Sequence, residues 1–211
     1  MVTRRLMAID PSLTCSGWAL FSVTTGSLMA VGKIHSIPAS HPMGYRLKAL
    51  QSRIQEMQDK LSLTSNDVLI CEAQTTMRDP RSAFKVEQVR GIFEAIARTK
   101  GVSVPGRINP RSVHHEIMGL KGKQAPRDQV KETAVRLVRA LFADSLQGMG
   151  FDICPTALSQ HQDIVDAILV GNLGVTWLKA ATSAGVEFDE YFESRIRSRR
   201  RPSVAAIRRA C

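Results

Sequence analysis

Four acidic residues occupy positions where a carboxylate calls for a chemical explanation. Asp10 ends the apolar run LMAI, Glu72 ends the apolar run VLIC, and Asp163 and Asp166 lie three residues apart in an apolar segment. Either strand-end acid alone is explained as the start of a turn, and Asp163 alone as a helix cap. Asp166 lies one turn deeper, where an unpaired carboxylate is costly. On a helix, residues three apart share one face, so Asp163 and Asp166 would point the same way.

If the fold brings these four carboxylates together, they form a site for divalent cations. Like charges in close proximity raise one another's pKa unless a cation compensates them. Oxygen ligands favour Mg²⁺ or Mn²⁺ over zinc, and the four cysteines lack the spacing of a zinc site. Two such ions roughly 4 Å apart are the usual device for phosphodiester hydrolysis. The residues therefore predict metal-dependent cleavage of a phosphodiester.

The net charge indicates a polyanionic partner. The chain has 211 residues, with 29 Lys and Arg against 19 Asp and Glu, which gives a formal charge of +10. Aromatic residues make up only 5% of the chain, which disfavours a single-strand binder built on stacked bases. Seven arginines and no acid lie in residues 194–211, so the rest of the chain carries only +3. We therefore expect a nuclease domain over residues 1–185 and an arginine-rich tail over residues 186–211, either disordered or DNA-binding.

The elements that must position the carboxylates follow from the apolar patterns. Strands are expected over 5–10, 16–23, 25–37, 67–72 and 102–108, and helices over 43–61, 82–99, 110–118, 127–142 and from about 160 onward, with a loop over 143–160. Three consecutive strands followed by alternating helices and strands indicate an α/β fold with a mixed sheet covered on both faces. Gly17 and Gly26 are interpreted as turn glycines.

The motifs, taken in order, resemble those of the RuvC family of Holliday-junction resolvases. They are IDPSLT at 9–14, CEAQ at 71–74 followed by residues 82–91, PRSV at 110–113 with the glycines and basic residues up to 130, and DIVDA at 163–167. Each motif is weakly specific, but the ordered set covers residues 5 to about 172. The resemblance implies a ribonuclease-H-like fold, with a mixed five-stranded β-sheet flanked by α-helices.

The resemblance also implies roles for residues of this chain. Asp10, Glu72, Asp163 and Asp166 match the family's catalytic, metal-binding carboxylates, with Mg²⁺ as the cofactor and Mn²⁺ as a substitute. In that family a homodimer grips a four-way junction and nicks two opposed strands symmetrically. The residues expected to contact DNA are Arg78, Arg81, Lys85, Arg90, Arg111, His114, Lys121, Lys123, Arg127 and Lys131.

Some positions depart from the family pattern. Ser12 replaces a usual glycine beside Asp10, and Thr75 replaces an aromatic residue that stacks on bases near the crossover. His114 and Arg127 fall on two basic-region lysines, and His114 would be mostly neutral at pH 7. These departures suit a phage-encoded or divergent member of the family.

Three alternatives to a junction resolvase stay open at this point. One is an endonuclease acting on forks or flaps, and another is a junction-binding protein that does not cleave. The third is a phosphate-handling enzyme or ATPase of the same fold superfamily, although no second glycine-rich phosphate loop is present. We expect no membrane span and no signal peptide, and a cytoplasmic location in a bacterial cell, or in the host if the protein is phage-encoded.

Overall fold

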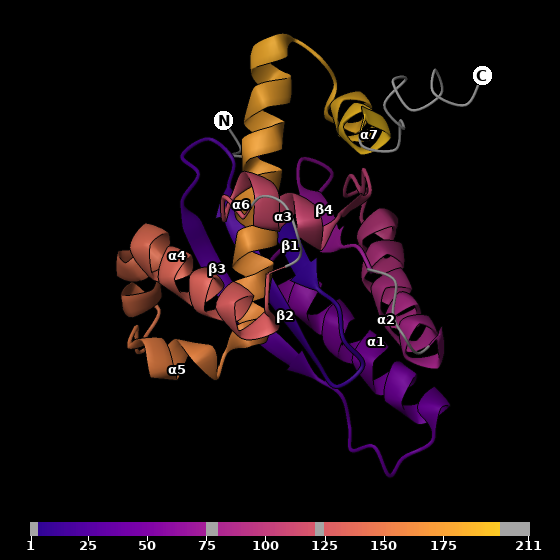
Figure 1. Ribbon diagram of the computed structural model, residues 1–211. Coiled ribbons are helices and arrows are strands. Elements are labelled where there is room, and N and C mark those ends of the chain that lie inside the picture. The colour runs from indigo at the N-terminus through magenta and orange to yellow at the C-terminus, as the bar shows by residue number, and fades with distance from the viewer. Residues whose placement is uncertain (1–3, 75–79, 121–124, 199–211) are drawn as a thin grey trace, which may run out of the picture.

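A mixed five-stranded β-sheet forms the centre of the molecule (Figure 1). The computed structural model describes residues 4–74, 80–120 and 125–198. The strands are β1 (Arg5–Asp10), β2 (Cys15–Ser22), β3 (Leu28–His35), β4 (Val68–Glu72) and β5 (Arg107–Ile108), in the order β3-β2-β1-β4-β5. Strands β1, β4 and β5 are parallel, whereas β2 runs antiparallel to both β1 and β3. The predicted mixed sheet is confirmed.

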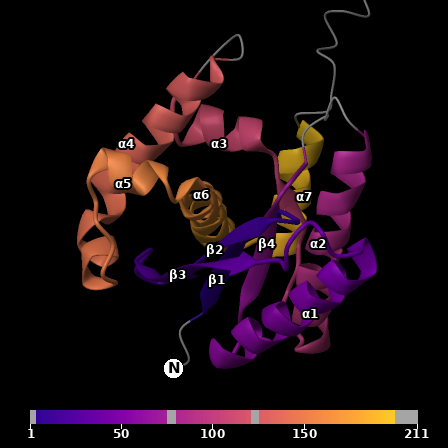
Figure 2. The ribbon, with the colours of Figure 1, turned by 90° about the horizontal axis from the view of Figure 1, so that it is seen from below.

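Helices cover both faces of this sheet (Figure 2). Helices α1 (Met43–Lys60) and α2 (Pro80–Thr99) pack on one face, and α6 (Gln162–Ala184) lies on the other. Helices α3 (Pro110–Glu116), α4 (Arg127–Gly148) and α5 (Pro155–Ser159) surround α6. Two apolar clusters, one on each face, form the core.

Helix α6 approaches the sheet closely because it carries glycines where it crosses the strands. A Cβ at Gly171 would lie 2.3 Å from a ring carbon of Phe21, and one at Gly174 would lie 2.3 Å from Cδ1 of Ile70. In the part of the chain that the structure describes, α6 is the one helix long and apolar enough to cross a membrane, but 72% of its apolar window is buried inside the protein. It is therefore the central core helix.

Several elements differ from their predicted bounds. Strand β5 has two residues rather than seven, because Pro105 cannot donate to a ladder and Gly106 turns the chain at φ +146°. Helix α4 continues beyond Phe142, where the backbone kinks at φ −133°, as far as Gly148. The loop predicted over residues 143–160 therefore contains the end of α4 and the short helix α5.

The folded body extends beyond the predicted boundary at residue 185. Helix α7 (Phe188–Ser198) packs on the core, with Phe188 and Phe192 3% and 0% exposed. The indole Nε1 of Trp177 donates to Glu116 at 3.0 Å, and Arg195 pairs with the same carboxylate at 2.5 Å. Arg195, assigned from sequence to the tail, thus belongs to the fold. The arginines from 199 onward lie outside the described residues.

Candidate active site

The four predicted carboxylates line a single cavity of about 530 Å³ at the carboxyl-terminal edge of β1 and β4. Because β1 and β4 are parallel neighbours, with Ile9 opposite Cys71, their last residues Asp10 and Glu72 reach the same edge. Asp163 and Asp166 come from the first turns of α6. The predicted convergence of the four carboxylates is confirmed.

Gly17 allows α6 to begin directly over the sheet. It lies inside β2, opposite Asp10 and Lys33. The prediction that Gly17 is a turn glycine is therefore wrong. A Cβ at Gly17 would lie 1.9 Å from the carbonyl oxygen of Asp163, so another residue there would displace the start of α6. The absent side chain is what lets Asp163 and Asp166 lie beside Asp10. Gly26, with φ +78°, is a turn glycine as predicted.

Two serines fix the turn that follows Asp10. The Ser12 backbone N–H donates to Oγ of Ser16 at 2.9 Å, and that hydroxyl donates in turn to the Ser12 carbonyl at 2.9 Å. Ser16 is fully buried. Among the described residues Ser62 is the one non-glycine residue with positive φ. Ser12 therefore occupies the usual glycine position without backbone strain.

The carboxylates are held in an environment that opposes their ionisation. Burial, reinforced by the charges of Asp166 and Asp163, raises the pKa of Asp10 to about 7. Burial also raises the pKa of Asp166 to about 6, although the hydrogen bond from Gln162 works against it. The pKa of Glu72 is raised well above its ordinary value by burial and then by the charge of Asp10. A cation among these oxygens would relieve this unfavourable charge.

The donor set fits a hard divalent cation. The acidic side chains in the cavity offer oxygen ligands of the kind that Mg²⁺ and Mn²⁺ prefer. Within the described ranges, no three Asp, Glu, His or Cys side chains are arranged to enclose one ion as they stand. Asp10, Glu72, Asp163 and Asp166 would hold the metal after adjustments of their side chains.

Two neighbours of the carboxylates were not predicted. Gln162 Nε2 donates to Oδ1 of Asp166 at 2.8 Å, and Lys33 Nζ lies 3.3 Å from Oδ2 of Asp163. The four-residue spacing of Gln162 and Asp166 is a signal that could have been found in the sequence. Lys33 lies 130 positions from its partner, and no local pattern connects the two.

The expected DNA contacts fall into three groups. His114, Arg127 and Lys131 line the carboxylate cavity, and burial lowers the pKa of His114, which fits the predicted neutral imidazole. Three others are exposed on helices nearby: Arg81, Lys85 and Arg111. The third group consists of Arg78, Lys121 and Lys123, which lie outside the described residues, as does Thr75.

Arg90 is the exception, because it is part of the fold. Its side chain is 1% exposed and forms ion pairs with Glu87 and Glu94. Glu94 also pairs with Arg98 and Arg107. This placement does not support the predicted DNA contact of Arg90, because its guanidinium is enclosed and paired with carboxylates within the protein.

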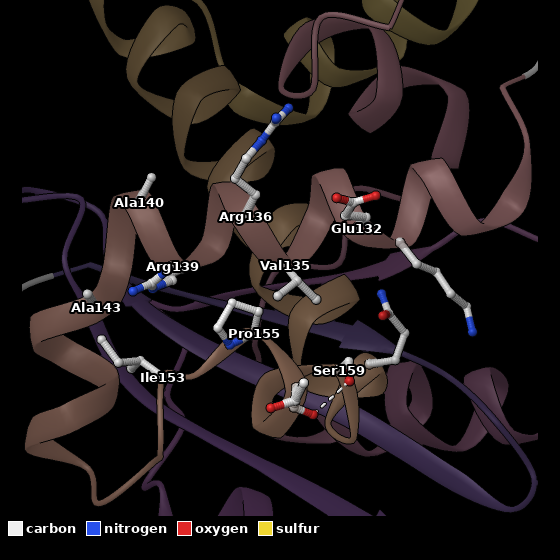
Figure 3. A pocket seen from close by; sticks show the side chains of 12 residues that line it. Glu132, Val135, Arg136, Arg139, Ala140, Ala143, Ile153, Pro155 and Ser159 are labelled. Carbon is white, nitrogen blue, oxygen red and sulfur yellow. Dashed lines mark hydrogen bonds between the residues drawn. The ribbon is translucent and has the colours of Figure 1, made fainter.

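A larger groove, shown in Figure 3, has lining residues in common with the carboxylate cavity. It has a volume of about 880 Å³ and lies between α4 and α5. Val135, Ile153 and Pro155 give it apolar walls, and Arg136 and Arg139 of α4 also line it. The two cavities share Lys131 and Gln162, so the groove continues from the carboxylates along α4.

Comparisons with known proteins agree with this architecture. The family model described as "Crossover junction endodeoxyribonuclease RuvC" matches residues 6–146. A protein of that same description from Hyphomonas neptunium is 26% identical over 160 residues, which cover 74% of this chain and 91% of the relative.

Two solved structures show the same fold. Thermus thermophilus RuvC, in complex with a Holliday junction substrate, matches with a TM-score of 0.62 at 19% identity, covering 85% of this chain and 97% of the other. The fowlpox virus Holliday junction resolvase matches with a TM-score of 0.51 at 14% identity, covering 82% of this chain and 98% of the other. The ribonuclease-H-like fold expected from the sequence motifs is confirmed.

Proposed function

The chain belongs to the RuvC family of crossover junction endodeoxyribonucleases, and we propose from this premise that it resolves four-way DNA junctions by hydrolysing a phosphodiester in each of two opposed strands. The family's nucleases are metal-dependent, and Mg²⁺ is the ion we propose, with Mn²⁺ as a substitute. The observation that carries the proposal is the convergence of Asp10, Glu72, Asp163 and Asp166 in one cavity.

We assign each carboxylate a role from its position. Asp10 and Asp166 would be direct metal ligands, because both are deep in the cavity and their pKa values are raised by burial. Glu72, which hydrogen-bonds to Asp10, would bridge to the metal or orient the attacking water. Asp163 would complete the set. The bound metal would supply a hydroxide equivalent at neutral pH and stabilise the leaving oxygen.

The basic residues beside the carboxylates would hold the scissile phosphate. Lys131 and Arg127 line the same cavity, and their charges partly offset the rise in the Asp166 pKa that burial causes, so both act on the carboxylate site. His114, kept neutral by burial, could donate a hydrogen bond to a phosphate but would add no charge. The groove along α4, with Arg136 and Arg139, extends the positive surface away from the cut.

Symmetric cutting requires two active sites, and we propose a homodimer. Helix α2 has Phe84 on its surface with 73% of the side chain exposed, a large apolar group that an interface would cover. The nuclease domain would extend through α7, and the arginines beyond it would add non-specific grip on DNA. We propose a cytoplasmic location, where such DNA is processed.

A cleavage assay on labelled junctions tests the proposal. Wild-type protein with Mg²⁺ should cut a four-way junction, and Asp166→Asn should bind the junction without cutting it. Asp144→Asn, a change of the same type at an exposed position on α4, is the control and should cut normally. Cleavage at the wild-type rate by the Asp166 variant would remove the mechanism.

Fork, flap and linear duplex substrates in the same gel separate the alternatives. Stronger cleavage of forks or flaps would indicate a general branched-DNA endonuclease. Tight junction binding without any cleavage by the wild-type protein would indicate a binding protein that does not cleave.

A further inference from the structure

We propose that Lys33 competes with the metal ion for Asp163 and so limits how tightly the active site holds metal. This inference rests on the proposed function, because it takes the carboxylate cavity to be a metal site. It concerns a residue on β3, the edge strand of the sheet, which contributes none of the four carboxylates.

The Lys33 side chain contacts the first turn of α6 and the residues just before it. Its ammonium Nζ lies 3.3 Å from Oδ2 of Asp163 and donates to the carbonyl oxygen of Gln160 at 3.2 Å. The Lys33 side chain is 18% exposed, which leaves the ammonium in a partly desolvated position. Among the four carboxylates, and within the described part of the chain, Asp163 alone has an ion pair.

The backbone holds this lysine in register with the site. Lys33 is opposite Gly17 in the β2–β3 ladder. The backbone carbonyl of Asp163 packs directly against Gly17, in the space that a side chain there would fill. Burial, and after it the neighbouring Asp163, raises the pKa of the Cys15 thiol, so Asp163 also interacts with the strand that carries Gly17. The Asp163 side chain is therefore held from the β2–β3 side of the cavity.

The charges then predict the direction of the effect. A metal ion drawn to Asp163 shares the carboxylate charge with the ammonium that already pairs with Oδ2, and it is repelled by that ammonium at short range. For a half-buried ion pair, these two contributions together lower the affinity of the site for the metal ion by on the order of tenfold. If Lys33 served only to orient Asp163 for the metal, removing its charge would instead weaken metal binding.

Titration of the DNA-free, full-length protein with Mn²⁺ tests the inference, with the bound ion counted by electron paramagnetic resonance. Lys33→Met, which keeps the length of the side chain without its charge, should bind Mn²⁺ about tenfold more tightly than the wild type. Lys33→Arg, which keeps the charge, should stay within about twofold of the wild type. Lys48→Met, at an exposed lysine of α1, is the matched control and should be unchanged.

The outcomes separate this inference from the proposed function. Unchanged or weaker Mn²⁺ binding by Lys33→Met would overturn the role of Lys33. Failure of the wild type to bind Mn²⁺ any better than Asp166→Asn would overturn the metal site itself. Circular dichroism reports whether each variant is folded, and Lys33→Gln replaces Lys33→Met if the latter is not. A lower Mn²⁺ requirement for junction cleavage by the neutral variant would be a second supporting result.

Discussion

Replacing Asp10 with asparagine should make the metal-free protein more stable at pH 8. The fold raises the pKa of Asp10 from 3.8 to about 7, chiefly through burial. A carboxyl group whose pKa is higher in the folded state favours folding while it is protonated. Its contribution is complete below about pH 4 and is lost as the pH rises through about 7. At pH 8 the ionised Asp10 therefore opposes folding, and an uncharged asparagine does not.

The size of the effect follows from the shift in pKa. Three pKa units correspond to about 4 kcal/mol if Asp10 titrates alone. Because Asp10 shares its protons with Glu72 and is not fully enclosed, we expect about half of this, roughly 2 kcal/mol. For a chain of this size, that free energy raises the melting temperature by about 4–8 °C.

Thermal melts in EDTA at pH 5 and pH 8 provide the assay. Asp10→Asn should melt about 4–8 °C above the wild type at pH 8 and only about 2–3 °C above it at pH 5, where the folded carboxyl is still protonated. Asp144→Asn, at an exposed position, should match the wild type at both values. Adding Mg²⁺ at pH 8 should stabilise the wild type and leave the Asp10 variant nearly unchanged. An Asp10 variant that melts at or below the wild-type temperature at pH 8 would refute the reasoning.

Three further variants probe the supports of the site. Gly17→Ala should lower the free energy of unfolding, measured in urea, by about 1–3 kcal/mol and the cleavage rate by at least about 100-fold, because the new Cβ displaces α6. Gly148→Ala, whose Cβ would meet no neighbour, is the control and should change neither quantity. Gln162→Leu should move the acid limb of the pH–rate profile to higher pH, because it removes the hydrogen bond that lowers the Asp166 pKa; an unmoved limb would count against that contact. Phe192→Ala should cost about 3–5 kcal/mol in urea because α7 loses its buried anchor, whereas a loose terminal helix would give almost no change.

The carboxylate site could be predicted because its determinants are local. Acids that end apolar strands, and two acids three residues apart on a helix, are visible in short windows of sequence. Gly17 and Lys33 could not be recognised in this way. Their roles depend on the cross-strand register of β2 with its two neighbours, and a shift of one residue would turn both to the opposite face.

The places of Arg90 and of helix α7 in the fold could not be recognised from the sequence, for one shared reason. Arg90 looked like one more surface cation, and only the packing of α2 shows that it is buried between Glu87 and Glu94. Helix α7 looked like part of a charged tail because its stabilising partners are distant in sequence. Glu116 lies 79 residues from Arg195, so neither its ion pair nor the packing of Phe192 on the core leaves a local signal.

Helix α6 is both the central helix of the core and the element that carries Asp163 and Asp166, the two carboxylates that we propose as catalytic. From Asp163 to Gly174 the helix spans about 16 Å. Because a helix moves as one rigid element, a small displacement or tilt of α6 near Gly174 also displaces Asp163 and Asp166. A misplacement of about 1 Å at a reacting centre costs on the order of 100-fold in rate, whereas a small repacking of the core costs little stability. In a mutagenesis screen for loss of cleavage, volume-conserving substitutions at Phe21 or Ile70 and alanine at Gly171 or Gly174 should therefore be recovered as inactive but folded proteins, although none of these residues lines the carboxylate cavity.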